Sequence, residues 1–190
     1  MISLTLRQIE WIPWYVFAAF WLITALRTRR IRATEKSANR LATLAVMCAA
    51  FVLLFDDRVP AGPLDRRFLP DEKWIACAGI GLTCVGVAIA IWARSCLGEY
   101  WSARVALKEE HQLIRSGPYR YVRHPIYAGM LLGAIGTTLV LGEWRGVIAV
   151  VLILIAHSRK AAREEALLTA EFGEEYLAYR RSTRFLFPGL

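Results

Sequence analysis

Five stretches of apolar residues recur along the chain, separated by polar and mostly basic segments. They cover residues 11–26, 41–55, 74–93, 125–142 and 147–158. At about 1.5 Å per residue, the first four are long enough, or nearly so, for a helix that crosses the roughly 30 Å apolar core of a bilayer. The fifth is shorter, but Trp144 and a snorkelling Arg145 extend it. The pattern predicts an all-α integral membrane protein with about five transmembrane helices.

Composition supports this prediction. Hydrophobic residues make up 56% of the 190 residues, and the mean hydropathy is +0.38. A soluble globular domain has an apolar share of about 45–50%, so a water-soluble bundle of buried helices is the weaker alternative.

The distribution of the 24 basic residues predicts the orientation of the chain. Eighteen lie after the first, third and fifth stretches, at Arg27, Arg29, Arg30, Arg32, Lys36, Arg40, Arg94, Arg104, Lys108, Arg115, Arg120, Arg123, Arg159, Lys160, Arg163, Arg180, Arg181 and Arg184. The remaining six lie before the first stretch or after the second and fourth stretches, at Arg7, Arg58, Arg66, Arg67, Lys73 and Arg145. Basic segments next to membrane spans usually stay in the cytoplasm, so we expect the segments after the first, third and fifth stretches to be cytoplasmic. This alternation puts the N-terminus outside and the C-terminus inside, which requires an odd number of spans. Nucleic-acid binding would need one basic face, whereas these charges flank apolar stretches.

We expect a single membrane domain over residues 1–190, with 1–93 as the scaffold and 94–190 as the cofactor and catalytic half. Only Arg7 precedes the first stretch and basic residues follow it, so we interpret this stretch as a retained anchor. The four cysteines include no pair at metal-ligand spacing, and we expect no metal site.

The segment before the fourth stretch carries more polar side chains than a simple connection needs. Gly117 and Pro118 indicate a turn. A residue before proline avoids the helical conformation, so we expect His124 to be extended while Pro125 begins the helix. The free N–H groups of that first turn attract anionic groups, and Tyr127 follows on the same face. These groups are expected to converge at the membrane surface; an interfacial histidine bonded to a backbone carbonyl is the alternative.

Two adjacent glutamates, Glu164 and Glu165, follow the fifth stretch in a segment predicted to form a C-terminal cytoplasmic helix. Adjacent residues point to different helix faces, so the spacing does not indicate a dyad that shares one proton. One interpretation is a solvated face on which Lys160 pairs with Glu164. In the other, one carboxylate faces the bundle and receives a cation or sugar hydroxyls. Gly173 indicates a break or a close contact in this helix.

The string GPYRYVRHPIYAG, followed about 35 residues later by REEALLTAEFGEEYLAYRRSTRFLFP, resembles the isoprenylcysteine carboxyl methyltransferase family, including its short prokaryotic members. It resembles the phospholipid N-methyltransferases more distantly. The resemblance covers residues 113–188 and implies S-adenosylmethionine as the cofactor, held between the RHPxYxG turn and the glutamate pair. By position, it implies cofactor contacts from Tyr119, His124, Tyr127, Gly129, Glu164, Glu165 and Tyr176. The catalytic arginine of the family corresponds to either Arg159 or Arg163.

An in-line methyl transfer is the expected chemistry. A carboxylate nucleophile is ionised at pH 7 and needs no base, so Arg159 or Arg163 would serve to align it. An amine nucleophile would need to lose a proton, which makes Glu165 or His124 a candidate base. We expect a lipophilic or lipidated substrate to arrive from the bilayer while the cofactor enters from the cytoplasm and leaves as S-adenosylhomocysteine. We expect no nucleic acid and no obligate protein partner.

Three other functional classes fit parts of the pattern. The first is a phospholipid or amine N-methyltransferase, which would share the cofactor and differ in the acceptor. A sterol-type membrane reductase would bind NADPH, but its motif resembles RHxNYxGD, and Pro125 and Ile126 fit the methyltransferase form better. A non-enzymatic membrane subunit would use the charges only to flank its spans. A soluble methyltransferase would need a doubly wound domain, for which the chain has no room.

Overall fold

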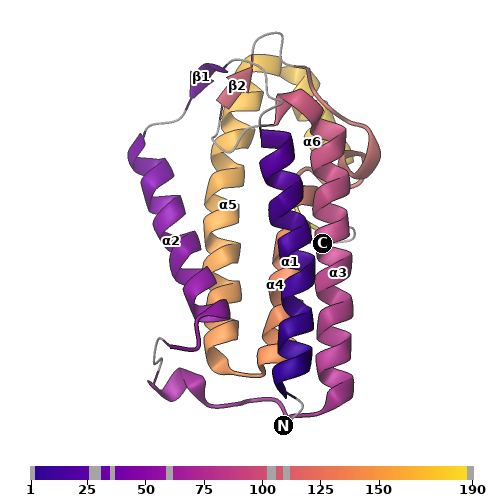
Figure 1. Cartoon of the computed structure of the whole chain (residues 1–190). Coiled ribbons are helices and arrows are strands. Elements are labelled where there is room, and N and C mark those ends of the chain that lie inside the picture. Colours follow the sequence, from indigo (N-terminus) through magenta and orange to yellow (C-terminus); the bar gives the residue numbers. More distant parts are fainter. Residues whose placement is uncertain are drawn as a thin grey trace.

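Five long helices run side by side and form the body of the molecule (Figure 1). The computed structural model describes residues 3–25, 31–34, 37–58, 62–101, 106–108 and 112–187. The long helices are α1 (Ser3–Ala25), α2 (Ser37–Phe55), α3 (Lys73–Leu97), α4 (Pro125–Leu141) and α5 (Trp144–Phe172). The connections contain the 3-10 turns Gly62–Asp65, Gly98–Tyr100 and Gly117–Arg120. Each predicted apolar stretch forms a large part of one long helix.

The fifth apolar stretch and the polar segment after it form one continuous helix, α5, of 29 residues. The predicted C-terminal helix therefore begins as an extension of α5. Gly173, at a φ of 53°, ends α5, and the short helix α6 (Glu174–Ser182) follows. A positive φ strains residues that carry a Cβ and is tolerated by glycine. The break that Gly173 indicated in the sequence is present.

A small antiparallel sheet lies at one end of the bundle. Its strands are β1 (Ile31–Thr34), between α1 and α2, and β2 (Ala106–Lys108), between α3 and α4 (Figure 1). The all-α prediction is right for the bundle but missed this sheet, because strands of four and three residues are too short to show an alternating pattern. Several residues used to predict the orientation lie outside the described residues, namely Arg27, Arg29, Arg30, Lys36 and Arg104.

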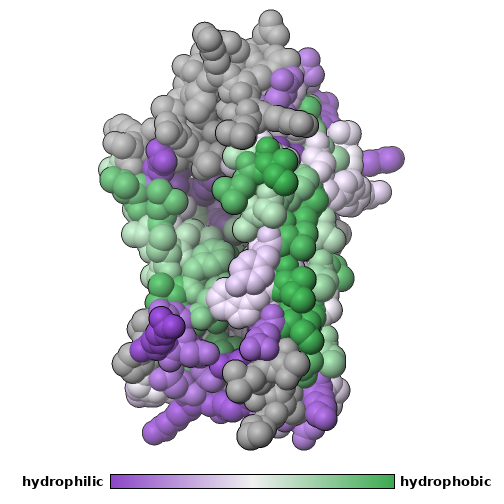
Figure 2. Space-filling view, viewed as in Figure 1, coloured by the Kyte–Doolittle hydropathy of each residue, from purple (hydrophilic) through white to green (hydrophobic). Residues whose placement is uncertain are grey.

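Among the described residues, two segments are long and apolar enough to cross a bilayer, Ala38–Phe55 in α2 and Lys73–Tyr100, which includes α3. The apolar helix α4 is shorter, with 17 residues. Figure 2 shows hydrophobic residues over the middle of the bundle and hydrophilic ones at the end where the N-terminus lies. Large apolar side chains such as Leu22 and Leu41 are more than half exposed, which suits contact with lipid. Crossing by α1, α4 and α5 stays a prediction.

Helices α3 and α4 pack closely because glycines face one another. A Cβ on Gly86 would lie 2.5 Å from the carbonyl oxygen of Gly129, and a Cβ on Gly129 would lie 2.5 Å from that of Gly86. Gly79 and Gly136 approach in the same way farther along the helices. Small residues let two membrane helices come within backbone contact. These contacts hold α4 against the first half and the middle of α3.

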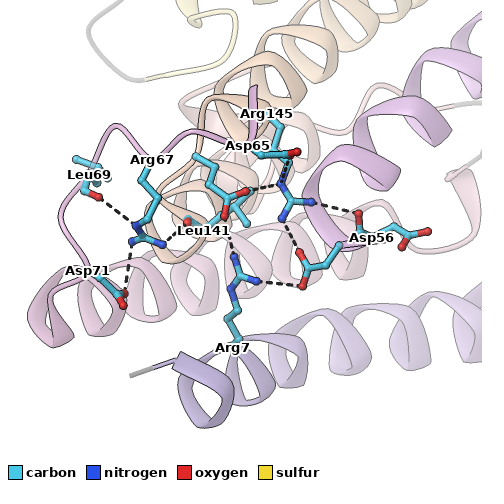
Figure 3. A network of polar contacts seen from close by, with 10 residues as sticks. Arg7, Asp56, Asp65, Arg67, Leu69, Asp71, Leu141 and Arg145 are labelled. Atoms are coloured by element: carbon cyan, nitrogen blue, oxygen red, sulfur yellow. Dashed lines mark hydrogen bonds and ion pairs between the residues drawn. The ribbon is translucent and has the colours of Figure 1, made fainter. Parts of the chain in front are cut away.

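The two ends of the bundle differ in charge. At one end, Arg7 and Arg145 form ion pairs with carboxylates of the α2–α3 and α4–α5 connections, as Figure 3 shows. The other end carries the basic residues of the α3–α4 connection, the α5 extension and α6, including Arg115, Arg123 and Arg180. This segregation agrees with the alternation expected from the sequence, and the orientation in a membrane stays a prediction.

Candidate active site

A pocket opens at the end of the bundle where α4 begins. It lies between the end of α3, the loop 112–124, the first turn of α4, the α5 extension and α6. Apolar and aromatic side chains form most of its lining, and polar groups come from Gln112, Arg123, His124, Lys160, Glu164 and the hydroxyls of several tyrosines. An apolar pocket with a few convergent polar groups is typical of a site for a small molecule.

Arg94 fixes one wall of this pocket. Its side chain is almost fully buried and donates to the carbonyl oxygens of Gly98 at 2.6 Å and Thr24 at 2.8 Å. The guanidinium also lies 4.4 Å from the ring centre of Trp101, which lines the pocket. A buried cation is costly unless polar groups and aromatic faces surround it. These contacts therefore join the end of α1 to the aromatic wall.

His124 stands directly before α4, and Pro125 takes the first helical position, as the sequence predicted. The backbone N–H of His124 donates to the carbonyl oxygen of Phe185, so a hydrogen bond from the C-terminal segment helps to hold His124 in place. The imidazole stacks on Tyr127 with ring centres 5.5 Å apart and planes inclined by 9°. The histidine ring contacts carboxylates and not the backbone carbonyl of the alternative interpretation.

The two glutamates take different positions around the His124 ring. The Tyr127 hydroxyl donates to Oε1 of Glu164 at 2.6 Å, and Nδ1 of His124 lies 3.7 Å from Oε2 of Glu164. On the other side of the ring, Nε2 lies 3.1 Å from Oε1 of Glu165. Glu164 lines the pocket, whereas Glu165 lies outside the lining and is more deeply buried. Glu164 is therefore the carboxylate that a bound molecule can touch.

Glu165 is held by three cationic or polar side chains. Nε of Arg123 donates to Oε1 at 2.8 Å, and Nε of Arg180 lies 3.4 Å from Oε2. Burial by itself raises the pKa of Glu165, but the hydrogen bonds from His124 and Arg123 together lower it to about 2. Glu165 is thus ionised at neutral pH and is a poor general base, which weakens the proton-acceptor role considered for it.

Buried tyrosines form another side of the pocket. The Tyr179 hydroxyl donates to the carbonyl oxygen of Tyr119 at 2.7 Å and joins α6 to the loop before α4. Tyr176 is buried and lines the pocket, and within the described part of the chain its hydroxyl has no hydrogen-bond partner. Burial raises the pKa of both Tyr119 and Tyr176, so the two hydroxyls stay protonated. The Tyr176 hydroxyl is a donor that a ligand can satisfy.

The structure places the two candidate catalytic arginines away from this pocket. Arg159 is exposed, and neither Arg159 nor Arg163 belongs to the lining. Arg163 donates to the hydroxyl of Thr43 on α2 at 2.9 Å. Lys160 lies in the lining instead, with Nζ 3.9 Å from Oε1 of Glu164. The pair that the sequence allowed as a solvated surface contact is part of the pocket wall.

Gly129 also lies outside the lining. It faces α3, where the space of a Cβ is taken by the Gly86 carbonyl and by Ala90. Its position gives it a role in helix packing and not in the pocket wall. Of the seven residues expected to contact the cofactor, the pocket brings together Tyr119, His124, Tyr127, Glu164 and Tyr176.

Sequence reasoning missed Arg123 and Arg180 as site residues. Arg123 precedes His124 directly, among the polar groups expected to converge at the start of the fourth stretch, but the sequence assigned it no contact. Its contact with Glu165 joins positions 42 residues apart, so only the folded chain reveals the pair. Arg180 has no local signal, because it is one of several basic residues in a charged C-terminal segment.

Comparison with known proteins bears on the class of this fold. The sequence profile of the isoprenylcysteine carboxyl methyltransferase (ICMT) family matches residues 79–170. A protein-S-isoprenylcysteine O-methyltransferase from Schizosaccharomyces pombe is 35% identical over 107 residues, which are 55% of this chain and 45% of that protein. A probable protein-S-isoprenylcysteine O-methyltransferase from Oryza sativa subsp. indica is 31% identical over 156 residues, 79% of this chain and 82% of the relative.

The fold resembles a solved structure. The eukaryotic intramembrane Ras methyltransferase ICMT superposes with a TM-score of 0.54 at 20% identity, over 83% of this chain and 55% of that chain. This chain thus spans about half the length of the solved enzyme and of the S. pombe relative, and most of the rice protein.

The helical bundle shares the fold of a membrane methyltransferase, and both relatives are named as protein-S-isoprenylcysteine O-methyltransferases. The chain belongs to the isoprenylcysteine carboxyl methyltransferase family.

Proposed function

We propose that this chain transfers the methyl group of S-adenosylmethionine to a lipophilic acceptor that bears a carboxylate, in a pocket at the cytoplasmic face of a membrane. The observation that carries the proposal is the placement of Glu164 in the pocket, with Tyr127 and His124 against it. Family membership supplies the reaction class, and the pocket supplies a place for both substrates.

The residues of the pocket fit the chemistry of this cofactor. Its ribose hydroxyls and ammonium group need acceptors, and Glu164 offers a carboxylate. Its own carboxylate needs donors, and Lys160 and the unpartnered Tyr176 hydroxyl offer them. Its adenine ring needs apolar walls, which the aromatic rings of Tyr100 and Trp101 provide.

When bound, the cofactor supplies an electrophilic methyl group on a sulfonium. A carboxylate acceptor is already ionised at neutral pH, so no residue has to remove a proton from it. The chain then has to hold two molecules in line and exclude water between them. Glu165 suits a supporting role of this kind, because its pKa of about 2 keeps it charged and engaged with Arg123 and His124.

Both candidate arginines lie outside the pocket lining; of the two, we propose that Arg163 aligns the acceptor carboxylate, which then extends from the pocket toward α2. It is partly buried and bonded to α2, a helix apolar enough to lie in the bilayer, whereas Arg159 is exposed. A guanidinium presents paired donors that match a carboxylate. The basic residues at this end of the bundle favour the cytoplasmic side for the pocket.

Binding measurements test the cofactor assignment. In thermal unfolding and calorimetry of the detergent-purified protein, S-adenosylmethionine and S-adenosylhomocysteine should stabilise the folded state while NADPH should not. Glu164→Gln should weaken cofactor binding at least about tenfold, because a charge-assisted hydrogen bond contributes roughly 1.5–3 kcal/mol. Glu174→Gln, an exposed change on α6, is the matched control. If wild type and Glu164→Gln bind S-adenosylmethionine with equal affinity, the assignment of Glu164 to the cofactor site is wrong.

Methyl transfer from labelled cofactor tests the acceptor. A small prenylated cysteine with a free carboxylate should accept the label, and the same compound with its carboxylate blocked as an ester should not. Near neutral pH the rate should change little, since the acceptor is fully ionised there. A rate that climbs with pH, together with transfer to a phospholipid amine, would identify an N-methyltransferase instead.

A further inference from the structure

A second pocket lies at the opposite end of the bundle, about 25 Å from the candidate active site along the 17 residues of α4. It is enclosed by the first turns of α1, the end of α2, the segment before α3 and the end of α4. Its apolar lining includes Trp11, Phe55 and Leu141. The proposed methyl transfer uses none of these residues.

Both arginines in this second pocket are already paired, as Figure 3 shows. The guanidinium of Arg7 lies 3.0 Å from the carboxylate of Asp57 and 3.3 Å from that of Glu143. Arg67 lies 3.5 Å from Asp71. Each of the pocket's two aspartates therefore has an arginine partner.

Glu10 is the charged residue of the lining that stands apart. Its side chain is 94% buried, since only 6% of the residue is exposed, and no donor among the described residues reaches its Oε1. The Thr137 hydroxyl accepts from the indole of Trp14 at 3.0 Å and can donate its own hydrogen to the Glu10 carboxylate, which leaves Oε1 as the oxygen that no donor of the described residues reaches. A buried carboxylate at the end of a membrane bundle is costly unless a cation or hydrogen-bond donor meets it.

The chemistry of the lining indicates the kind of group that it fits. The pocket offers one buried carboxylate oxygen that no donor of the described residues reaches, and apolar aromatic walls beside it. Trp11 and Phe55 pack on each other with ring centres 4.7 Å apart and planes inclined by 47°, and they form an apolar wall for hydrocarbon. A metal ion would need several oxygen ligands, and the described residues contain no group of three or more histidine, cysteine or acidic side chains that could hold one.

We propose that this second pocket binds the primary ammonium group of an amphiphile, with an ammonium N–H donating to Glu10 and the hydrocarbon lying on Trp11 and Phe55. A phospholipid with an ethanolamine headgroup presents this group at the depth of a bundle end.

A headgroup series on the purified full-length chain in detergent micelles tests the proposal. Phosphatidylethanolamine, phosphatidylcholine and phosphatidylglycerol with identical acyl chains are added, and the unfolding temperature and the lipids retained in native mass spectrometry are measured. Phosphatidylethanolamine should stabilise the protein most, because the quaternary ammonium of phosphatidylcholine has no N–H to donate and phosphatidylglycerol has no cation. Equal effects of the three lipids would overturn the proposal without any variant.

Substitution of the carboxylate locates the effect. Glu10→Gln should lower the affinity for phosphatidylethanolamine roughly tenfold or more and leave the responses to the other two lipids unchanged. Glu72→Gln, an exposed change at the same end and outside the pocket lining, should behave as wild type. A preference for phosphatidylethanolamine that persists in Glu10→Gln would contradict the assignment. If free ethanolamine raises the unfolding temperature of wild type but not of Glu10→Gln, the pocket binds the same ammonium group from a soluble molecule.

Discussion

Nε of Arg123 and Oε1 of Glu165 lie 2.8 Å apart, and each side chain is only 10% exposed. The pair joins the loop before α4 to the extension of α5, and His124 contacts the same carboxylate oxygen. The ion pair therefore supports one side of the pocket, where Arg123 belongs to the lining and Glu165 does not.

Removing one partner of this ion pair should destabilise the folded protein. Arg123→Ala leaves Glu165 buried with less charge compensation, which typically costs about 3–5 kcal/mol. Urea unfolding in detergent micelles measures the loss, and Arg120→Ala, an exposed change in the same segment, should have little effect. Similar stabilities for the two variants would mean that the pair is not a significant support.

Acid should weaken the contribution of Glu165. Its pKa in the folded protein is about 2, below the ordinary value of 4.5, so its stabilising effect is complete above about pH 4.5 and is lost as the pH falls toward 2. The difference in unfolding free energy between wild type and Glu165→Gln should shrink over this range. In an Arg123→Ala background the same difference should depend less on pH, because one of the hydrogen bonds that lower the pKa is gone.

A methyl group at the α3–α4 contact should reduce stability and leave chemistry intact. The Cβ of Gly129→Ala would meet the Gly86 carbonyl at 2.5 Å, and overpacking of this kind costs about 1–3 kcal/mol. Gly81→Ala on α3 is the control, since nothing lies within 4 Å of its Cβ position. The unfolding temperature and the KM for the cofactor separate the two roles. A raised KM in Gly129→Ala at unchanged stability would assign Gly129 to cofactor contact after all.

Two neighbouring basic residues of α5 should respond differently to loss of charge. Lys160→Gln removes a cation that lies 3.9 Å from Glu164 and should raise the KM for the cofactor severalfold. Arg159→Gln changes an exposed side chain outside the lining and should leave the kinetics near wild type. Steady-state methyl transfer measures both. The reverse order of effects would restore Arg159 as the catalytic candidate.

Much of the architecture was predictable because it depends on local chemistry. Uncharged stretches predicted the long helices, Pro125 predicted the start of α4, and Gly173 indicated the break before α6. The two strands were missed because they have only four and three residues, which are too few to show an alternating pattern. Their pairing joins residues more than 70 positions apart, such as Ile31 and Lys108, and depends on how the helices meet.

The candidate site was predictable in part. Tyr127 and His124 follow one another closely in a motif, and their convergence is a property of a single helix start. The choice between Glu164 and Glu165 was not available from the sequence, because it depends on the rotation of α5 against α4. The same rotation decides that Lys160 enters the lining and Arg159 does not.

The continuity of α5 links the two ends of the molecule. Arg145 near its first residue is fixed among the carboxylates at one end, and Glu164 lies in the pocket near the other end. Nineteen residues of unbroken helix separate them, which is roughly 28 Å at 1.5 Å per residue. The separation between this charged end and the pocket is therefore determined by a helix length, and an insertion of a single residue between them would rotate the glutamates by about 100° away from His124.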